Sequence, residues 1–243
     1  DGDTSLVSVM SVNNETGTIQ PLEAVVEIAH ASGAWAHTDA VQALGRIPLD
    51  FVALGLDLMS LSAHKVGGPV GVGALVVRRG LGLAPVGLGG GQESNLRSGT
   101  QLAALASAFA AASREAVASL EVEDARLRGY VSDLEALVAG MGGTRVNGGT
   151  ERSASIVNVT FDGIRADDLL LLLDRAGVDC STGSACRAGV HQPSDVLLAM
   201  GRSVADASAS LRFSLGWSTT RADIDRLCEL LPDALESARR ALR

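Results

Sequence analysis

Short apolar runs alternate with amphipathic segments along the first part of the chain. Strands are predicted over residues 5–12 (SLVSVMSV), 34–40 (AWAHTDA), 56–63 (LDLMSLSA) and 71–79 (GVGALVVRR), where apolar and β-branched residues are dense. A helix is predicted over residues 21–33, which open with Pro21 and close with Gly33. Because short apolar strands separated by helical segments favour a parallel sheet, we expect an α/β domain with a mainly parallel sheet.

The second half of the chain begins with helical spacing and then returns to alternating strands and helices. Residues 100–139 are apolar at helical intervals, which predicts one long helix or two. Further strands are predicted over 155–161, 178–180 and 209–217, and further helices over 166–177, 193–201 and 221–243. We therefore expect a second, smaller α/β domain, with residues 1–116 in the first domain and residues 117–243 in the second.

Composition argues against several classes of protein. The 243 residues are 47% hydrophobic, enough for one or two packed cores, and no basic cluster offsets the net charge of −8. Direct binding to nucleic acid or to a membrane surface is therefore not expected, and no stretch is long and apolar enough to span a bilayer. The odd number of cysteines, three, indicates free thiols and a cytoplasmic protein, and no metal site is predicted.

Polar and ionisable residues follow three of the predicted strands. They are Asn13, Asn14 and Glu15 after the first strand, Asp39 and Gln42 after the second, and Ser62, His64 and Lys65 after the third. Because the carboxyl ends of parallel strands lie along one edge of a sheet, these side chains are expected to meet there. A lysine, a carboxylate and small hydrogen-bond donors are the groups that bind pyridoxal phosphate, so the sequence predicts a site for this cofactor.

Each of these residues also has an ordinary structural explanation. Lys65 alone is typical of a solvated loop, and Asp39 alone is typical of a helix cap or a turn. Asn13 and Asn14 together are typical of a turn, and the glycine-rich residues 67–73 lack the pattern of a nucleotide-binding P-loop. The cofactor hypothesis depends on the agreement of all three strand ends.

Two residues of the second domain add to this hypothesis. Cys186 lies among small and polar residues in STGSACRAG, which suits an exposed thiol, and the neighbouring Arg187 favours the thiolate; the alternative is an inert surface cysteine. Cys180 ends a short predicted strand and Cys228 lies among leucines of a predicted amphipathic helix, so both fit an inert, structural role better. Arg212 alternates with apolar residues along its strand and suits a clamp for a substrate carboxylate, the alternative being a salt-bridged or solvated arginine.

Six sequence motifs, spread over nearly the whole chain, add to these single residues. They are VMSVNNETGTIQP, HTDAVQALGRIPLD, MSLSAHKVGGPVGVGALVVRR, GGGQESNLRSGT, STGSACRAG and SLRFSLG. Together they resemble the cysteine desulfurases of the class V aminotransferase group, the NifS/IscS type. The resemblance implies the fold of type I pyridoxal-phosphate-dependent transferases, with residues 1–116 as the C-terminal part of the large cofactor-binding domain and residues 117–243 as the small domain that carries the cysteine loop.

The resemblance also implies how the cofactor is held. Lys65 would bind pyridoxal phosphate covalently, Asp39 would pair with the ring nitrogen, and Gln42 would bond to the ring hydroxyl. Ser62 and His64 would contact the phosphate group. Thr100 would reach the phosphate of a neighbouring subunit's cofactor, which implies a homodimer.

The implied reaction converts L-cysteine to L-alanine. Asn14 would lie beside the ring and the substrate, and Arg212 would bind the substrate carboxylate. Cys186 would be the nucleophile that receives the sulfur as a persulfide and passes it to an acceptor protein, either an iron–sulfur scaffold or a tRNA thiolation enzyme.

Two alternatives keep the same motifs. The substrate could be selenocysteine, because the sequence does not separate sulfur from selenium. The chain could also be a fragment, or one half of a split protein, that is inactive without a complementing part. This second alternative is expected because the first predicted strand already begins at Ser5, whereas the family has a phosphate loop and a ring-stacking histidine before that strand.

Overall fold

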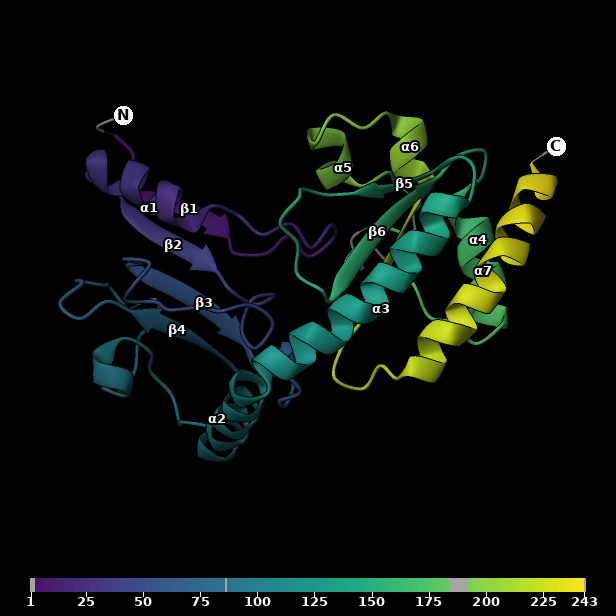
Figure 1. The fold of residues 1–243 in the computed structure, drawn as a ribbon. Coiled ribbons are helices and arrows are strands. Elements are labelled where there is room, and N and C mark those ends of the chain that lie inside the picture. Colours follow the sequence, from purple (N-terminus) through teal and green to yellow (C-terminus); the bar gives the residue numbers. More distant parts are fainter. Residues whose placement is uncertain (1–2, 86, 184–191, 243) are drawn as a thin grey trace. The chain divides into compact units, whose positions relative to one another are not determined.

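The computed structural model describes residues 3–85, 87–183 and 192–242. Within it the chain forms two compact units (Figure 1). The first consists of residues 1–11 and 20–120, and the second of residues 12–19 and 121–243. The boundary predicted between residues 116 and 117 falls in the last turn of helix α2 (Ala103–Ala118). The sequence pattern did not predict that residues 12–19 join the second unit.

A four-stranded sheet forms the centre of the first unit. Its strands are β1 (Leu6–Met10), β2 (Trp35–Asp39), β3 (Leu58–Ser62) and β4 (Gly73–Val77), in that spatial order (Figure 1). The pairs β1–β2 and β2–β3 are parallel, whereas β3 and β4 form an antiparallel pair. The prediction of a mainly parallel sheet is therefore confirmed for this unit.

Helix α1 (Leu22–Ala31) covers part of this sheet because its apolar residues recur at helical spacing. Leu22, Val26 and Ala29 are its buried residues. Val26 and Ala29 pack with Ala34, Ala36 and Leu56 in one hydrophobic cluster. Such burial stabilises the unit by roughly 1.5–3 kcal/mol for each large aliphatic side chain.

Two helices occupy the predicted helical stretch of residues 100–139. Helix α2 ends at Ala118, and helix α3 (Leu120–Gly140) follows after Ser119. In the first unit, α2 lies close to the short 3₁₀ turn Ala63–Lys65 and to Gly45. The second helix, α3, belongs almost entirely to the second unit.

The second unit contains a three-stranded antiparallel sheet. Its strands are β5 (Thr144–Asn147), β6 (Ile156–Phe161) and β7 (Ser210–Ser214), with β6 in the middle. Besides α3, its helices are α4 (Ala166–Arg175), α5 (Asp195–Ala199), α6 (Val204–Ser208) and α7 (Arg221–Ala241) (Figure 1). Strand β5 and helix α6 are short, and the sequence pattern did not predict either.

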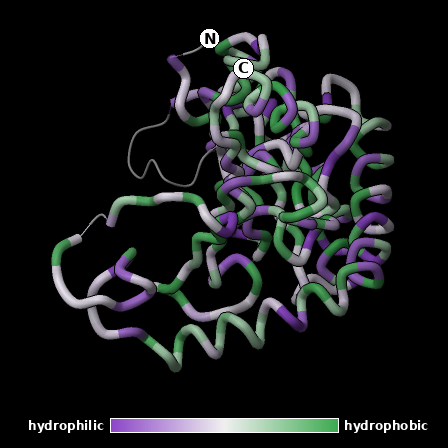
Figure 2. The backbone as a smooth tube through the Cα atoms, turned by 90° about the vertical axis from the view of Figure 1, so that its left-hand side faces the viewer, coloured by the Kyte–Doolittle hydropathy of each residue, from purple (hydrophilic) through white to green (hydrophobic). Residues whose placement is uncertain are grey.

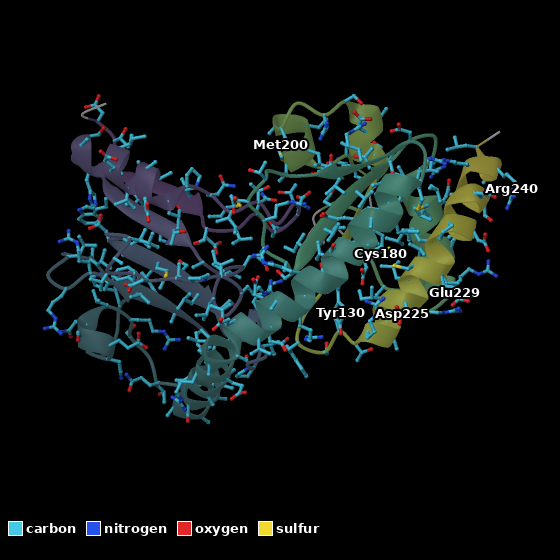
Figure 3. All side chains as sticks on the ribbon, viewed as in Figure 1. Tyr130, Cys180, Met200, Asp225, Glu229 and Arg240 are labelled. Carbon is cyan, nitrogen blue, oxygen red and sulfur yellow. The ribbon has the colours of Figure 1, made fainter. Side chains whose placement is uncertain are left out.

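Helix α7 illustrates how the sequence pattern builds the core of this unit. Leu227, Leu231 and Leu235 lie on its buried side and pack with residues of α3, α4 and the sheet. Asp225 and Glu229 lie on its outer, exposed side (Figure 3). The alternation of hydrophobic and hydrophilic residues along helical turns is visible in Figure 2. The two-sided pattern is typical of a helix that packs on one face only.

The strand predicted over residues 178–180 is not present. The chain leaves α4 through Gly177, at φ +83°, and pairs with β7 only at Ser181, whose backbone exchanges two hydrogen bonds with Arg212. Val178 and Cys180 instead pack against the hydrophobic core without joining a β-ladder. The prediction was wrong because apolar residues that line a core do not by themselves indicate strand pairing.

Candidate active site

The strand ends of the first unit bring five of the predicted site residues to one edge of the sheet. Asp39 is the last residue of β2, and Ser62 is the last residue of β3. The register pairs Asp39 with Ser60, so the two strands end close to the same level. Gln42 follows β2 within a turn, and His64 and Lys65 lie in the 3₁₀ turn directly after β3.

Lys65 is half-buried at this edge, and its backbone is held by an arginine. The Nη2 group of Arg46 donates to the Lys65 carbonyl oxygen at 3.1 Å, and the Nη1 group donates to Oε1 of Gln42. Within the part of the chain that the structure describes, the Lys65 amine has no hydrogen-bond or ion-pair partner. An amine of this kind is available for covalent chemistry.

His37 lies on the same strand as Asp39, two residues earlier, and therefore on the same face. Its Nδ1 is 2.7 Å from Oγ of Ser8, and its Nε2 is 2.9 Å from Oγ of Ser60. Burial lowers the pKa of His37, and the nearby Asp39 carboxylate opposes this effect. Asp39 is exposed, and its Oδ1 accepts a hydrogen bond from the Val41 amide at 2.9 Å.

Ser62 and His64 contact each other, and glycine allows close backbone packing beside them. The Ser62 Oγ lies 2.8 Å from His64 Nδ1. A Cβ atom on Gly73 would lie 2.7 Å from the Leu61 carbonyl oxygen, and one on Gly68 would lie 3.0 Å from the Ala63 carbonyl oxygen. The glycine-rich segment is therefore packed against the turn that carries Lys65, which a larger residue at these positions would displace. Thr100 is also in the first unit, exposed in the segment before α2.

Arg212 and Asn14 lie in the second unit. Nη1 of Arg212 donates to the Asn14 carbonyl oxygen at 3.0 Å, and Nη2 lies 3.4 Å from Ser181 Oγ. The alternation predicted for β7 is confirmed, because Leu211, Phe213 and Leu215 are buried while Arg212 is only half-buried. The structure thus brings together Arg212 and the backbone of Asn14.

The residue that follows Asn14 carries a buried carboxyl group. Glu15 is 4% exposed, its Oε2 accepts a hydrogen bond from the Ser194 hydroxyl, and its carbonyl oxygen accepts one from Nδ2 of Asn158 at 3.2 Å. The Ser194 hydroxyl also accepts from the Leu197 amide at 3.1 Å and so caps α5. Cys186 lies outside the residues that the structure describes.

The other two cysteines have thiols of low reactivity. Burial, together with the nearby carboxylates of Asp179 and Asp174, raises the pKa of Cys180 (labelled in Figure 3) to about 11. Burial also raises the pKa of Cys228, assisted by Asp133. Since the thiolate is the nucleophile, both thiols are poorly suited to attack near neutral pH. The expected structural role of Cys180 and Cys228 is consistent with these surroundings.

Sequence reasoning gave no site role to three residues near the predicted site residues, although it named Glu15 among the polar residues that follow the first strand. Arg46 lies four residues after Gln42, His37 lies two before Asp39, and Glu15 directly follows Asn14. The strand period of two could have identified His37. No pattern in the sequence indicates the contact between Arg46 and Lys65, which are distant along the chain. In the described ranges, no group of three or more potential metal ligands occurs, and no helix is both long and apolar enough to cross a bilayer.

The residues at the edge of the first sheet fit the predicted cofactor. The set contains an amine without a partner in the described part of the chain, an exposed carboxylate, and the donors of Gln42, Ser62 and His64. The Oδ2 atom of Asp39 accepts no hydrogen bond from any described residue, so it is available to a ring N–H. This is the combination that pyridoxal phosphate requires: an imine-forming amine, a partner for the ring nitrogen, and phosphate ligands.

The chain is similar in sequence to known proteins over nearly its whole length. A model of the family described as Aminotransferase class-V matches residues 1–227. An "IscS-like cysteine desulfurase" of Mycobacterium tuberculosis is 49% identical over 242 residues, which are 98% of this chain and 62% of that protein.

Solved structures agree with the sequence comparison. A NifS-like protein from Rickettsia africae superposes with a TM-score of 0.87 at 29% identity, covering 96% of this chain and 62% of the other. SspA in complex with cysteine superposes with a TM-score of 0.72 at 34% identity, covering 88% and 59%. The chain thus has the fold of NifS-like proteins, and it spans about 60% of the length of these relatives.

Proposed function

Because the chain belongs to the aminotransferase class-V family, we propose that it carries the chemistry of a pyridoxal-phosphate-dependent cysteine desulfurase. The observation that carries this proposal is the meeting of Asp39, Gln42 and Lys65 at one sheet edge. The relatives named as cysteine desulfurases, and the neighbour solved with cysteine, support L-cysteine as the substrate.

In this proposal the first unit holds the cofactor. Lys65 binds it covalently through Nζ, and the Asp39 carboxylate holds a proton on the ring nitrogen. The Gln42 amide donates to the ring hydroxyl oxygen, and Ser62 and His64 donate to the phosphate. When bound, pyridoxal phosphate supplies an electron sink for charge that develops at the substrate's α-carbon.

The second part of the proposal concerns the substrate. Arg212 pairs with the carboxylate of L-cysteine, and Asn14 lies beside the substrate. The Lys65 amine would accept the α-proton of the substrate and return it. The carbon–sulfur bond of L-cysteine breaks as a sulfur–sulfur bond forms on Cys186, so that the products are L-alanine and a persulfide.

Partners and location are part of the same proposal. Thr100 reaches the cofactor of a second copy, so the active form is a homodimer. The persulfide passes to an acceptor protein, an iron–sulfur scaffold or a tRNA thiolation enzyme, in the cytoplasm. The name IscS-like of the Mycobacterium tuberculosis relative supports the iron–sulfur acceptor.

Cofactor binding tests the proposal most directly. The full protein, purified and mixed with pyridoxal 5′-phosphate, should develop a visible absorbance band, and addition of L-cysteine should yield L-alanine. Lys65→Ala should lose the band, whereas Arg78→Met, an arginine that pairs with Asp57 in the same unit, should keep it. A band of equal intensity in Lys65→Ala, or no band in the unaltered protein, would contradict the proposal.

A further inference from the structure

Arg46 links two residues of the proposed cofactor site. It lies in the turn after β2, and its guanidinium donates to Oε1 of Gln42 and, at 3.1 Å, to the carbonyl oxygen of Lys65. One planar side chain thus contacts both the amide that faces the ring hydroxyl and the backbone of the lysine that binds the cofactor. All three residues belong to the first unit.

The surroundings of Arg46 set it apart from the surface arginines of the chain. It is half-buried, and burial lowers its pKa, yet among described residues no carboxylate pairs with it. Its two acceptors are instead a neutral amide and a backbone carbonyl. A cation kept in such a place is costly, which argues for a role beyond surface solubility.

The chemistry of the guanidinium fixes the orientation of the Gln42 amide. Arginine has five N–H donors and no acceptor, so the amide must turn its oxygen towards Arg46. The amide's NH₂ group then points elsewhere and can only donate. A glutamine free to flip would present either its oxygen or its NH₂ group to the ring hydroxyl, and the oxygen would repel a negatively charged partner.

The backbone around Arg46 is itself fixed by close packing. The preceding residue, Gly45, has φ +69°, and a Cβ atom there would lie 2.5 Å from the Cβ of Ala116 in α2. The same helix lies against the turn Ala63–Lys65. The backbone of Arg46 is therefore held in a fixed position. The hydrogen bond from its side chain to the Lys65 carbonyl oxygen in turn restrains the backbone of Lys65, whose amine reacts in the proposed function.

We propose that Arg46 is a positioning residue for the cofactor: it locks the Gln42 amide with its NH₂ group towards the ring oxygen and holds the backbone of Lys65. This inference rests on the proposed function. Held in this way by Arg46, the Gln42 amide can only donate to the ring oxygen, and its donation stabilises negative charge on that oxygen.

The test is a double-mutant cycle on bound cofactor. Arg46→Met should weaken binding of pyridoxal 5′-phosphate about tenfold, the loss of one hydrogen bond to a charged group. It should also raise the pH midpoint at which the visible absorbance band changes. Without a fixed donor from Gln42, negative charge on the ring oxygen is less stable, so the proton is lost only at higher pH. Gln42→Ala should shift the midpoint in the same direction, and adding Arg46→Met to Gln42→Ala should shift it little further.

Two further variants separate positioning from folding. Arg46→Lys, which can reach one acceptor but not both in fixed geometry, should give an intermediate affinity and midpoint. Arg78→Met removes a structural arginine of the same unit, so it should lower thermal stability and leave the midpoint unchanged. If Arg46→Met leaves the midpoint unchanged, or shifts it additively with Gln42→Ala, the inference is wrong. A protein that binds no cofactor in unaltered form would refute the proposed function instead.

Discussion

At the scale of single residues, the structure distinguishes the three cysteines by their surroundings. Cys180 packs against the main core of the second unit, and Cys228 packs beside a smaller cluster. Burial and nearby carboxylates keep the pKa of both thiols high. The assignment of Cys186 as the sulfur-accepting residue therefore rests on its sequence context and family resemblance, and on the poor nucleophilicity of the other two.

The first prediction concerns these cysteines. Cys186→Ser should keep the visible band of bound cofactor but form no persulfide from L-cysteine. Cys180→Ser and Cys228→Ser should still form it, because at neutral pH a thiol with a pKa of about 11, as in Cys180, is almost entirely protonated. Intact mass after exposure to L-cysteine measures the added sulfur. A persulfide that survives in Cys186→Ser would move the nucleophile to another thiol.

The positions of site residues were predictable where strand geometry alone decides them. Asp39, Ser62 and Lys65 could be assigned to one edge because parallel strands end together, and the register of β2 and β3 has this form. Arg46 could not be assigned, since its contact with Lys65 depends on how a turn folds back over another element. Side-chain contacts across turns need three-dimensional packing that no period in the sequence encodes.

At the scale of elements, most helices and strands of the described residues were predictable, and two short ones were not. Helix α7 and strand β6 have strong patterns and were predicted close to their observed bounds. Strand β5 has four residues and helix α6 has five, and neither segment has a clear apolar period. Both owe their conformation to neighbours, since β5 pairs with β6 and the Ser203 hydroxyl caps α6.

The anchoring of helix α5 gives a prediction at this scale. Its N-cap, Ser194, accepts from the Leu197 amide and donates to the buried carboxyl group of Glu15. Ser194→Ala removes both bonds and leaves an acceptor buried without its donor. We expect a loss of about 2–3 kcal/mol in the free energy of unfolding of the second unit, measured by denaturant titration.

A matched variant isolates the contribution of Glu15. Ser203→Ala removes the cap of α6, where the hydroxyl accepts from the Asp206 amide at 3.0 Å in an exposed position. It should cost only about 1 kcal/mol, the ordinary value for a helix cap. Equal losses in the two variants would show that the bond to Glu15 contributes nothing to stability.

At the scale of the whole molecule, the two units have separate hydrophobic clusters. The first is built on α1 and its sheet, and the second on α3, α4, α7 and the antiparallel sheet. A change that acts on one cluster should therefore affect the stability of that unit. The first unit also contains a buried ionisable group whose titration links stability to pH.

That group is Asp57, whose side chain is 1% exposed. Its carboxylate accepts from the Ala36 amide at 2.8 Å, lies 2.9 Å from His30 Nε2, and pairs with Arg78 Nε at 2.5 Å. Burial alone would raise the pKa of Asp57, but the Ala36 amide, His30 and Arg78 together hold it below its ordinary value. The folded state therefore binds the Asp57 proton less readily than the unfolded state does.

This difference fixes the sign of the pH dependence. Because the pKa is depressed on folding, the stabilisation from Asp57 is complete above the unfolded-state pKa of about 4 and is lost as the pH falls through the lower folded-state value. Asp57→Asn should lower the free energy of unfolding of the first unit by about 2 kcal/mol at neutral pH. This loss is small for a buried ion pair because the Arg78 side chain is 54% exposed, so water screens part of its attraction to Asp57.

The decisive measurement is the difference in unfolding free energy between the unaltered protein and Asp57→Asn as a function of pH. It should be constant from about pH 7 to pH 5 and should shrink below about pH 4, because only the unaltered protein then loses its carboxylate. Glu27→Gln, on the exposed face of α1, serves as the control and should change stability little at any pH. A difference that stays constant down to the lowest pH measured would mean that the Asp57 carboxylate gains no net stabilisation from its three partners.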